Sequence, residues 1–402
     1  MKKNIFELCT KQLKEIALTL KTEVDKGLEK EKMQVQCLPT YIKPNKNIEQ
    51  GKALVLDLGG TNYRAAIVEF IDGKPCIHPE NGFKKDLSIM KEQGFTEKNL
   101  FKEIADLISE LNLDGVNSIG YCFSYPAKPL FNGDAELLYW TKGVNINEMV
   151  GKNVGESLMK YLNKNLDKAD FKSIKVINDT IASLFSGLTD KSDAYIGLIV
   201  GTGTNMATFI HSDHIKKLDP AYTQKGLVPI NLESGNFMPP HLTEVDNKVD
   251  SFSDIKGMQR FEKAVSGMYL GDILKSVFPF DRFEEKFDAQ KLTGIMNYPD
   301  IHRKKYIRVA RWIYQRSAQL VAASLAGLIL VLLEHDNSIK KICLTAEGSL
   351  FWSSDDYEKN YRKIVLDELH NLLEEFGHDD VKVHIPKKAN ANLIGSAVAA
   401  LS

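Results

Sequence analysis

The hydrophobic pattern of the chain opens with a helix and continues as strands. Phe6, Leu13, Ile16, Leu20 and Val24 recur at helical spacing, which predicts an amphipathic N-terminal helix. A proline-containing loop follows and marks a boundary. Continuous or alternating apolar runs then predict strands over residues 53–70, 118–123 and 174–177, and a second strand pair that starts at residue 194.

Helices separate these strands and dominate the rest of the chain. Helical spacing predicts helices over residues 97–111, 258–274, 306–333, 356–376 and 393–401, and another that begins near residues 179–180. Short apolar runs predict two later strands, over residues 341–344 and 381–385. The uncharged stretch 317–333 contains Ser and Gln and is shorter than a full membrane span, which favours a buried core helix. Strands and helices that alternate in two halves predict an α/β fold with mixed sheets.

Two of the predicted strands run into glycine-rich turns with the same Gly-Thr-Asn ending. These are VLDLGGTNYR at residues 55–64 and IVGTGTN at residues 199–205. Glycine lets phosphate oxygens approach the backbone, since a Cβ would block them, and it reaches positive φ without strain. Consecutive N–H groups and the Thr hydroxyls then form an anion site. A single such turn is usually structural, but the repetition predicts a duplicated fold that holds one nucleotide from both sides.

Only the first turn is preceded by a carboxylate, Asp57. A carboxylate beside bound phosphates would repel them unless a divalent cation lay between. We therefore expect Mg²⁺ on the side of the first turn.

Composition narrows the class of protein. The 402 residues suffice for two core-bearing domains, and 52 basic against 53 acidic side chains give a net charge of −1. This balance argues against a nucleic-acid partner or a membrane-surface role, because both usually need a basic excess. The five cysteines form no CxxC pair and are odd in number, which predicts reduced thiols and a cytoplasmic protein. The chain contains no GxxxxGK[ST], GxGxxG, HExxH or GxSxG motif, which argues against P-loop enzymes, Rossmann dehydrogenases, zincins and α/β-hydrolases.

Four further segments carry candidate chemistry: CFSYP (122–126), YWTKGV (139–144), VINDTIASL (176–184) and INLESGNF (230–237). Each has a structural alternative. Asp179 resembles a helix N-cap, and Lys142 a solvated loop lysine. Glu233 could be a surface loop acid, and Glu262 a polar residue of an amphipathic helix. Taken singly, none of these residues supports a catalytic role.

In combination, the segments resemble the hexokinase and glucokinase family of the actin-like ATPase superfamily. The resemblance rests on the order DLGGTNYR, FSYP, WTKG, NDT, GTGTN, NLESG, QRFEKAVSGMYLGD and AEGSLF, and it runs from about residue 53 to residue 395. It implies a two-domain, actin-like (ribonuclease H-like) α/β sugar kinase fold with mixed sheets and an interdomain cleft. The implied parts are an N-terminal helix on the large domain (1–45), a small domain (46–180), a large domain (181–390) and a C-terminal helix that returns to the small domain (391–402).

The resemblance also assigns roles to residues. It implies that Asp179 is the catalytic base for the sugar 6-hydroxyl and that Thr141 and Lys142 belong to a loop that closes over the sugar, with Lys142 also catalytic. The implied ligands of the sugar hydroxyls are Ser124, Asn178, Asn205, Glu233, Gln259 and Glu262. The implied nucleotide-binding residues are Asp57, Gly59, Gly60, Thr61, Asn62 and Arg64, then Gly201, Thr202, Gly203 and Thr204, then Gly348 and Ser349. We also expect the helix dipole to favour the ionised form of Asp179.

The implied activity is transfer of the γ-phosphoryl group of MgATP to the 6-hydroxyl of an aldohexose, with glucose first and mannose or other aldohexoses as further substrates. The implied partners are ATP and ADP, no nucleic acid and no membrane, for a cytoplasmic monomer or homodimer. The chain departs from the family pattern at Tyr125, Pro129 and Glu347, and ANANLIGSAV (389–398) lacks the usual Gly-Ser-Gly run. Two other functions compete with this one: a sugar sensor built on a kinase scaffold, and a kinase specific for mannose or an amino sugar.

Overall fold

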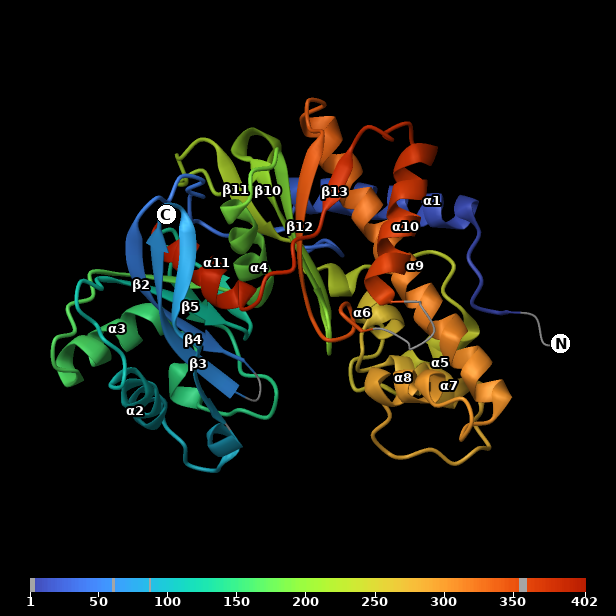
Figure 1. Ribbon diagram of the computed structural model, residues 1–402, viewed down its shortest axis with the longest axis horizontal. Helices are drawn as coiled ribbons and strands as arrows, with labels where there is room; N and C mark the ends of the chain where they lie inside the picture. The colour runs from blue at the N-terminus through green and yellow to red at the C-terminus, as the bar shows by residue number, and fades with distance from the viewer. Residues whose placement is uncertain (1–3, 60–61, 87, 354–359) are drawn as a thin grey trace.

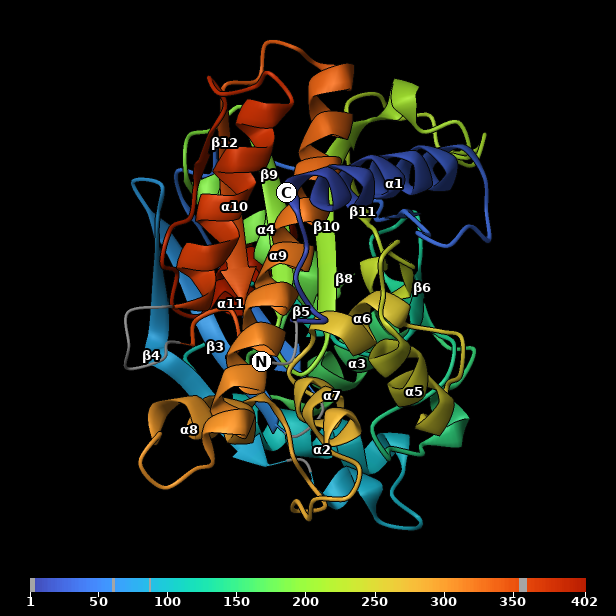
Figure 2. The same ribbon diagram turned by 90° about the vertical axis from the view of Figure 1, so that its right-hand side faces the viewer.

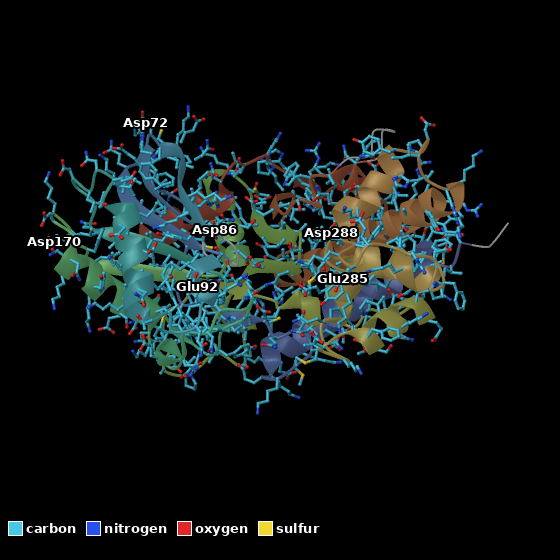
Figure 3. All side chains as sticks on the ribbon, turned by 90° about the horizontal axis from the view of Figure 1, so that it is seen from below. Asp72, Asp86, Glu92, Asp170, Glu285 and Asp288 are labelled. Carbon is cyan, nitrogen blue, oxygen red and sulfur yellow. The ribbon has the colours of Figure 1, made fainter. Side chains whose placement is uncertain are left out.

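The computed structural model describes residues 4–59, 62–86, 88–353 and 360–402, and it consists of two halves that are each built on a β-sheet (Figure 1). One half holds a five-stranded sheet with α2 and α3, and the other holds a six-stranded sheet with the long helix α9 and its neighbours. Seen from below, Asp86 and Glu92 lie on the first half, and Glu285 and Asp288 on the second (Figure 3).

The five-stranded sheet has the order β4-β3-β2-β5-β8. Its strands are β2 (Gly51–Leu58), β3 (Asn62–Ile71), β4 (Lys74–Asp86), β5 (Ser118–Phe123) and β8 (Ser173–Ile177). β2, β5 and β8 are parallel to one another, while β3 is antiparallel to both β2 and β4. Leu54 and Leu56 face the core beneath α2 (Glu97–Ile108) and α3 (Val154–Asn165), whereas Ala53 and Val55 face the opposite core. β2 is therefore buried on both faces, which explains its continuous apolar sequence.

The six-stranded sheet has the order β1-β11-β10-β9-β12-β13. Its strands are β1 (Leu38–Pro39), β9 (Ala194–Val200), β10 (Thr204–His211), β11 (Leu227–Asn231), β12 (Lys341–Glu347) and β13 (Lys382–His384). β9, β12 and β13 are parallel, and the other pairs are antiparallel. The core on one face also contains residues of α1 (Thr10–Glu29), α9 (Lys304–His335) and α10 (Tyr361–Glu375). The opposite face shares a core with α4 (Asp179–Ser186).

Two short helices join the sheets. α4 and α11 (Ala391–Ala400) pack against each other between the two sheets, and both contribute to one apolar core (Figure 1). A Cβ at Gly395 would lie 1.7 Å from the carbonyl oxygen of Ala182, so only glycine allows this close approach. The C-terminal helix thus contacts β2 and β5 of the first half as well as α4.

The core helix α9 is long and apolar enough to cross a membrane by length and composition, but 89% of its most apolar 18-residue window is buried inside the protein. α1 packs on it (Figure 2), and a Cβ at Gly327 would lie 2.3 Å from the carbonyl oxygen of Ala17. The interpretation of residues 317–333 as a buried helix is confirmed.

The other elements correct several expectations. The single helix predicted over residues 258–274 is wrong, because two helices, α6 (Arg260–Val265) and α7 (Leu270–Val277), cover this stretch with an interruption between them. Three helices were not predicted: α3, α5 (Glu244–Phe252) and α8 (Ala289–Asn297). α10 begins at Tyr361, and residues 356–359 of its predicted range lie outside the described residues. The small hairpin of β6 (Ala127–Pro129) and β7 (Ala135–Leu137) completes the first half.

Candidate active site

The first glycine-rich turn joins β2 to β3 as predicted. Asp57 and Arg64 are opposite one another in the strand register, and the Asp57 Oδ2 atom accepts bonds from Arg64 Nη2 at 2.7 Å and Nε at 3.2 Å. The Gly59 N–H donates to the Asn62 carbonyl oxygen at 3.0 Å and closes the turn. Gly60 and Thr61, which were predicted to bind phosphate, lie outside the described residues.

A cavity of about 540 Å³ opens beside this turn. Seven predicted site residues line it: Asp57, Gly59, Asn62, Arg64, Ser124, Lys142 and Asp179. Four lining residues were not predicted: Asn81, Lys84, Asn390 and Asn392. The last two fall in the segment that departs from the family pattern, and that departure was the only signal in the sequence for them.

Asp179 is the first residue of α4, directly after the helix N-cap. The cap is Asn178, whose Oδ1 accepts from the Ile181 N–H at 2.8 Å, so the N-cap interpretation of Asp179 is wrong. Asp179 Oδ1 instead accepts from the Thr180 N–H at 2.7 Å and from the Thr180 hydroxyl at 3.2 Å.

The electrostatic environment of Asp179 also differs from expectation. Burial raises the pKa of Asp179, and this effect outweighs Lys142 and the Thr180 hydrogen bonds, which lower that pKa. The Asp57 carboxylate raises it further. The Thr180 N–H at the helix terminus thus favours the ionised form as expected, but burial outweighs it. A carboxylate of raised pKa is a stronger proton acceptor.

Tyr125 links Lys142 to the first glycine-rich turn. Lys142 Nζ donates to the Ser124 carbonyl oxygen at 2.6 Å and lies 4.9 Å from the centre of the Tyr125 ring. The Tyr125 hydroxyl donates to the Gly59 carbonyl oxygen at 2.9 Å. Thr141 is half-buried beside Lys142. Tyr125, a departure from the family pattern, thus touches both the predicted sugar loop and the predicted phosphate turn.

A chain of hydrogen bonds holds Glu233 at the end of β11. Asn205 Nδ2 donates to Asn231 Oδ1 at 2.8 Å, and Asn231 Nδ2 donates to Glu233 Oε1 at 2.6 Å. Burial raises the pKa of Glu233, and this amide bond opposes the rise. Asn231 was part of the INLESGNF segment but was not predicted as a site residue; the structure shows that it orients Glu233.

The side chains of Glu262 and Gln259 lie close to two glycines. Glu262 Oε2 accepts from the Thr204 N–H at 3.0 Å, and a Cβ at Gly203 would lie 2.6 Å from this oxygen. A Cβ at Gly235 would lie 2.4 Å from Gln259 Oε1. A side chain at position 203 would therefore displace the Glu262 carboxylate from this position, and the φ of Gly203 is not positive, contrary to the expected use of positive φ. Burial raises the pKa of Glu262.

The second glycine-rich turn is held by a neighbouring loop. The Gly201 carbonyl oxygen accepts from the Gly267 N–H at 2.6 Å, and the adjacent Thr202 is exposed. Gly348 has a φ of 112°, and a Cβ there would clash with the backbone of β9, so glycine is required at this position. Ser349 follows it on the surface.

The predicted residues thus form two groups, one per half. Asn205, Glu233, Gln259, Glu262 and the second turn do not line the 540 Å³ cavity. The groups still interact electrostatically, since Asp179 raises the pKa of Glu233. Within the second group, Glu233 raises the pKa of Glu262. Among the described residues, no group of three or more His, Cys, Asp or Glu side chains could hold a metal ion.

Backbone strain marks the same positions. Nine described non-glycine residues have positive φ, and four of them are site or cavity residues: Lys142 (58°), Glu233 (52°), Gln259 (53°) and Asn390 (58°). Such conformations cost about 1–3 kcal/mol and gather at functional sites. This concentration supports a functional role for both groups.

Comparisons with known proteins identify relatives of this chain. One model of the hexokinase family matches residues 2–188, and a second matches residues 195–280 and 279–402. Hexokinase-1 of Mus musculus is 33% identical over 288 residues, which is 68% of this chain but 29% of that protein. Hexokinase-2 of Oryza sativa subsp. japonica is 29% identical over 381 residues, or 92% of this chain and 75% of that protein. The chain therefore spans less than a third of the aligned mouse relative and most of the rice one.

Solved structures show the same fold. A hexokinase from Schistosoma mansoni, solved as a complex with glucose, superposes with a TM-score of 0.77 at 27% identity and covers 99% of this chain and 97% of that one. The two-domain α/β sugar kinase fold predicted from the sequence is confirmed. Because both family models match and together extend over nearly the whole sequence, this chain belongs to the hexokinase family.

Proposed function

We propose that this protein transfers the γ-phosphoryl group of ATP to the 6-hydroxyl of an aldohexose, with glucose as the main substrate and mannose as a further one. The observation that carries the proposal is the position of Asp179. Its carboxylate lines a cavity together with Arg64, Lys142 and the first glycine-rich turn, and burial raises its pKa. A base and cationic side chains around one cavity meet the main requirements of phosphoryl transfer, which needs positioning and charge neutralisation more than covalent chemistry.

On the nucleotide side, the two glycine-rich turns would bind the phosphates. Asp57 fits a role toward Mg²⁺, because it supplies hard carboxylate oxygens at the cavity and both bonds from Arg64 end on Oδ2, which leaves Oδ1 without a bond from Arg64. Bound Mg²⁺ would neutralise charge on the phosphates. Arg64 and Lys142 would add positive charge from the protein.

On the sugar side, Asp179 would orient the 6-hydroxyl and accept its proton as the phosphoryl group is transferred. The proposed ligands of the other hydroxyls are Ser124, Thr141, Asn178, Asn205, Glu233, Gln259 and Glu262. Carboxylates and carboxamides suit this task because each desolvated hydroxyl needs a donor or acceptor, and a buried mismatch costs about 1–3 kcal/mol.

The two groups of site residues support closure as part of the mechanism. Glu233 and Glu262 belong to the half with the six-stranded sheet and do not line the cavity that holds Asp179. We propose that sugar draws a small domain (46–180) toward a large domain (181–390, with the N-terminal 1–45), while residues 391–402 stay with the small domain. Assembly of the site only with sugar would limit hydrolysis of ATP by water.

The proposed cellular setting is a cytoplasmic monomer or homodimer. The cytoplasmic part of this proposal is supported by the five cysteines, which are free thiols, three of them buried: Cys37, Cys122 and Cys343.

The test is ADP release from MgATP against a panel of hexoses, with identification of the product as the 6-phosphate. Turnover of about 1–100 per second with glucose is expected for such a kinase. Turnover confined to mannose or an amino sugar would select the other kinase function. Sugar binding without turnover for every hexose would select the sensor and refute the proposal.

A further inference from the structure

The Arg64 guanidinium contacts the C-terminal segment as well as Asp57. Arg64 Nη1 donates to Asn390 Oδ1 at 2.9 Å, across 326 residues of sequence. Together with the two bonds to Asp57, this occupies three of the five N–H donors of the guanidinium. Arg64 lines the cavity and its side chain is 24% exposed, so its remaining donors are available to an anionic ligand there.

The Asn390 side chain is itself held by two strands, β3 through Arg64 and β4 through Glu80. Asn390 precedes α11 with φ 58° and ψ 37°, and its side chain makes no capping bond to that helix. Asn390 Nδ2 donates to the Glu80 carbonyl oxygen of β4 at 3.3 Å. Asparagine tolerates this left-handed backbone better than most residues, and the conformation directs a fixed acceptor at Arg64.

The neutral charge of Asn390 has a consequence for the cavity. Arg64 already shares its charge with Asp57 at 2.7 Å. A carboxylate at position 390 would bring a second negative charge to Arg64, whereas a carboxamide supplies the same acceptor without one. Lys84 also lines this wall and lies opposite Arg64 in the strand register. The wall made by β3, β4 and Asn390 therefore keeps a net positive charge.

We propose that Asn390 is a positioning residue for the nucleotide: it holds the Arg64 guanidinium so that its free N–H groups face the phosphates of the nucleoside triphosphate. The inference rests on the proposed kinase function. Without Asn390, the bonds of Arg64 to other described residues are those to Asp57 alone, and the guanidinium loses the hydrogen bond at Nη1 that restricts its rotation. Affinity for ATP then falls while affinity for sugar is retained, because Asn390 belongs to the wall made by β3, β4 and Asn390, which we call the nucleotide wall.

The experiment compares two variants with the parent protein. Asn390→Gly removes the acceptor and keeps the left-handed backbone, whereas Asn390→Asp keeps both the acceptor and the backbone. Steady-state kinetics give KM for ATP and for glucose, and calorimetry with MgADP gives nucleotide affinity independently of turnover. We expect Asn390→Gly to raise KM for ATP about tenfold, which corresponds to about 1.4 kcal/mol, with KM for glucose within twofold of the parent. Asn390→Asp should lie between the parent and Asn390→Gly, because it keeps the bond but adds a negative charge.

The matched control is Lys32→Gly, at an exposed residue with φ 59° outside the cavity. It should leave both KM values unchanged. The inference is overturned if Asn390→Gly leaves KM for ATP and MgADP affinity within twofold of the parent. It is also overturned if both KM values rise together with a loss of thermal stability, or if Asn390→Asp is no better than Asn390→Gly. A parent protein that phosphorylates no hexose would instead refute the proposed function.

Discussion

Replacing Asp179 by Asn is the sharpest test of the proposed chemistry, because the structure separates the two possible roles of this residue. Helix α4 is capped by Asn178, so the substitution leaves the cap intact. An Asn side chain can also accept the bonds that Asp179 Oδ1 now receives from Thr180, at 2.7 Å and 3.2 Å. What Asn lacks is the ability to take a proton from a hydroxyl.

The expected loss of turnover follows from general base catalysis. Such catalysis contributes about 10²–10⁴-fold, which corresponds to about 2.7–5.4 kcal/mol of activation free energy. The same substitution should not lower the free energy of unfolding. The folded-state pKa of Asp179 is raised, so its contribution to stability is fully present below the unfolded pKa and is lost as pH rises through the folded pKa. Above its folded-state pKa the ionised group therefore destabilises the fold, and the Asn variant should have an equal or higher Tm.

Three measurements check this prediction: kcat at saturating glucose and MgATP, glucose affinity by calorimetry, and Tm at pH 7. The matched control is Asp288→Asn, at the exposed N-cap of α8, where Oδ1 accepts from the N–H groups of Gln290 and Lys291. Asn caps about as well as Asp, so the control should be silent. An Asp179→Asn variant with kcat within a few-fold of the parent, alongside a silent control, would refute the assignment of Asp179 as base.

Four further outcomes are expected. Glu233→Ala should weaken glucose binding by about 1.5–3 kcal/mol in calorimetry, the value of a charge-assisted hydrogen bond; unchanged affinity would remove Glu233 from the sugar site. Tyr125→Phe deletes the hydroxyl that donates to Gly59 at 2.9 Å, and the loss of about 0.5–1.5 kcal/mol should appear as a two- to tenfold higher KM for ATP; an unchanged KM for ATP would show that this bond does not support the phosphate turn. Because the pKa of Asp179 is raised, kcat/KM for glucose should fall with decreasing pH, starting above the usual range of an aspartate; a flat profile down to pH 4 would contradict this. Small-angle scattering should show a smaller radius of gyration with glucose than without, and equal radii with demonstrated binding would exclude closure.

The sequence predicted the elements that local physics controls. The apolar runs before and after the two glycine-rich turns form the hairpins β2–β3 and β9–β10, because buried strands need continuous apolar residues and the turns need small ones. The uncharged segment 317–333 forms the centre of α9, because only the core can accept such a helix in this fold. The family resemblance could also be recognised from the sequence, because each of its motifs is a short contiguous segment.

The tertiary structure determines where the predicted helices and strands end and which charged side chains lie close together. Helical spacing continues through residues 258–274, but the helix ends after α6. There the Gly267 N–H donates to the Gly201 carbonyl oxygen and holds the second turn. The sequence also suggested a helix dipole that favours ionised Asp179, whereas burial among distant segments raises its pKa.

The nucleotide wall shows most clearly which contacts the sequence alone could not predict. The sequence determined that Arg64 follows a glycine-rich turn, because strand and turn are encoded within ten residues. It did not show that Asn390 accepts a bond from Arg64, since this contact exists only after α11 packs between the two sheets. Hydrogen bonds between segments 326 residues apart depend on the summed burial of many side chains. No local sequence pattern predicts that summed burial, so the contact between Arg64 and Asn390 is seen only in the folded structure.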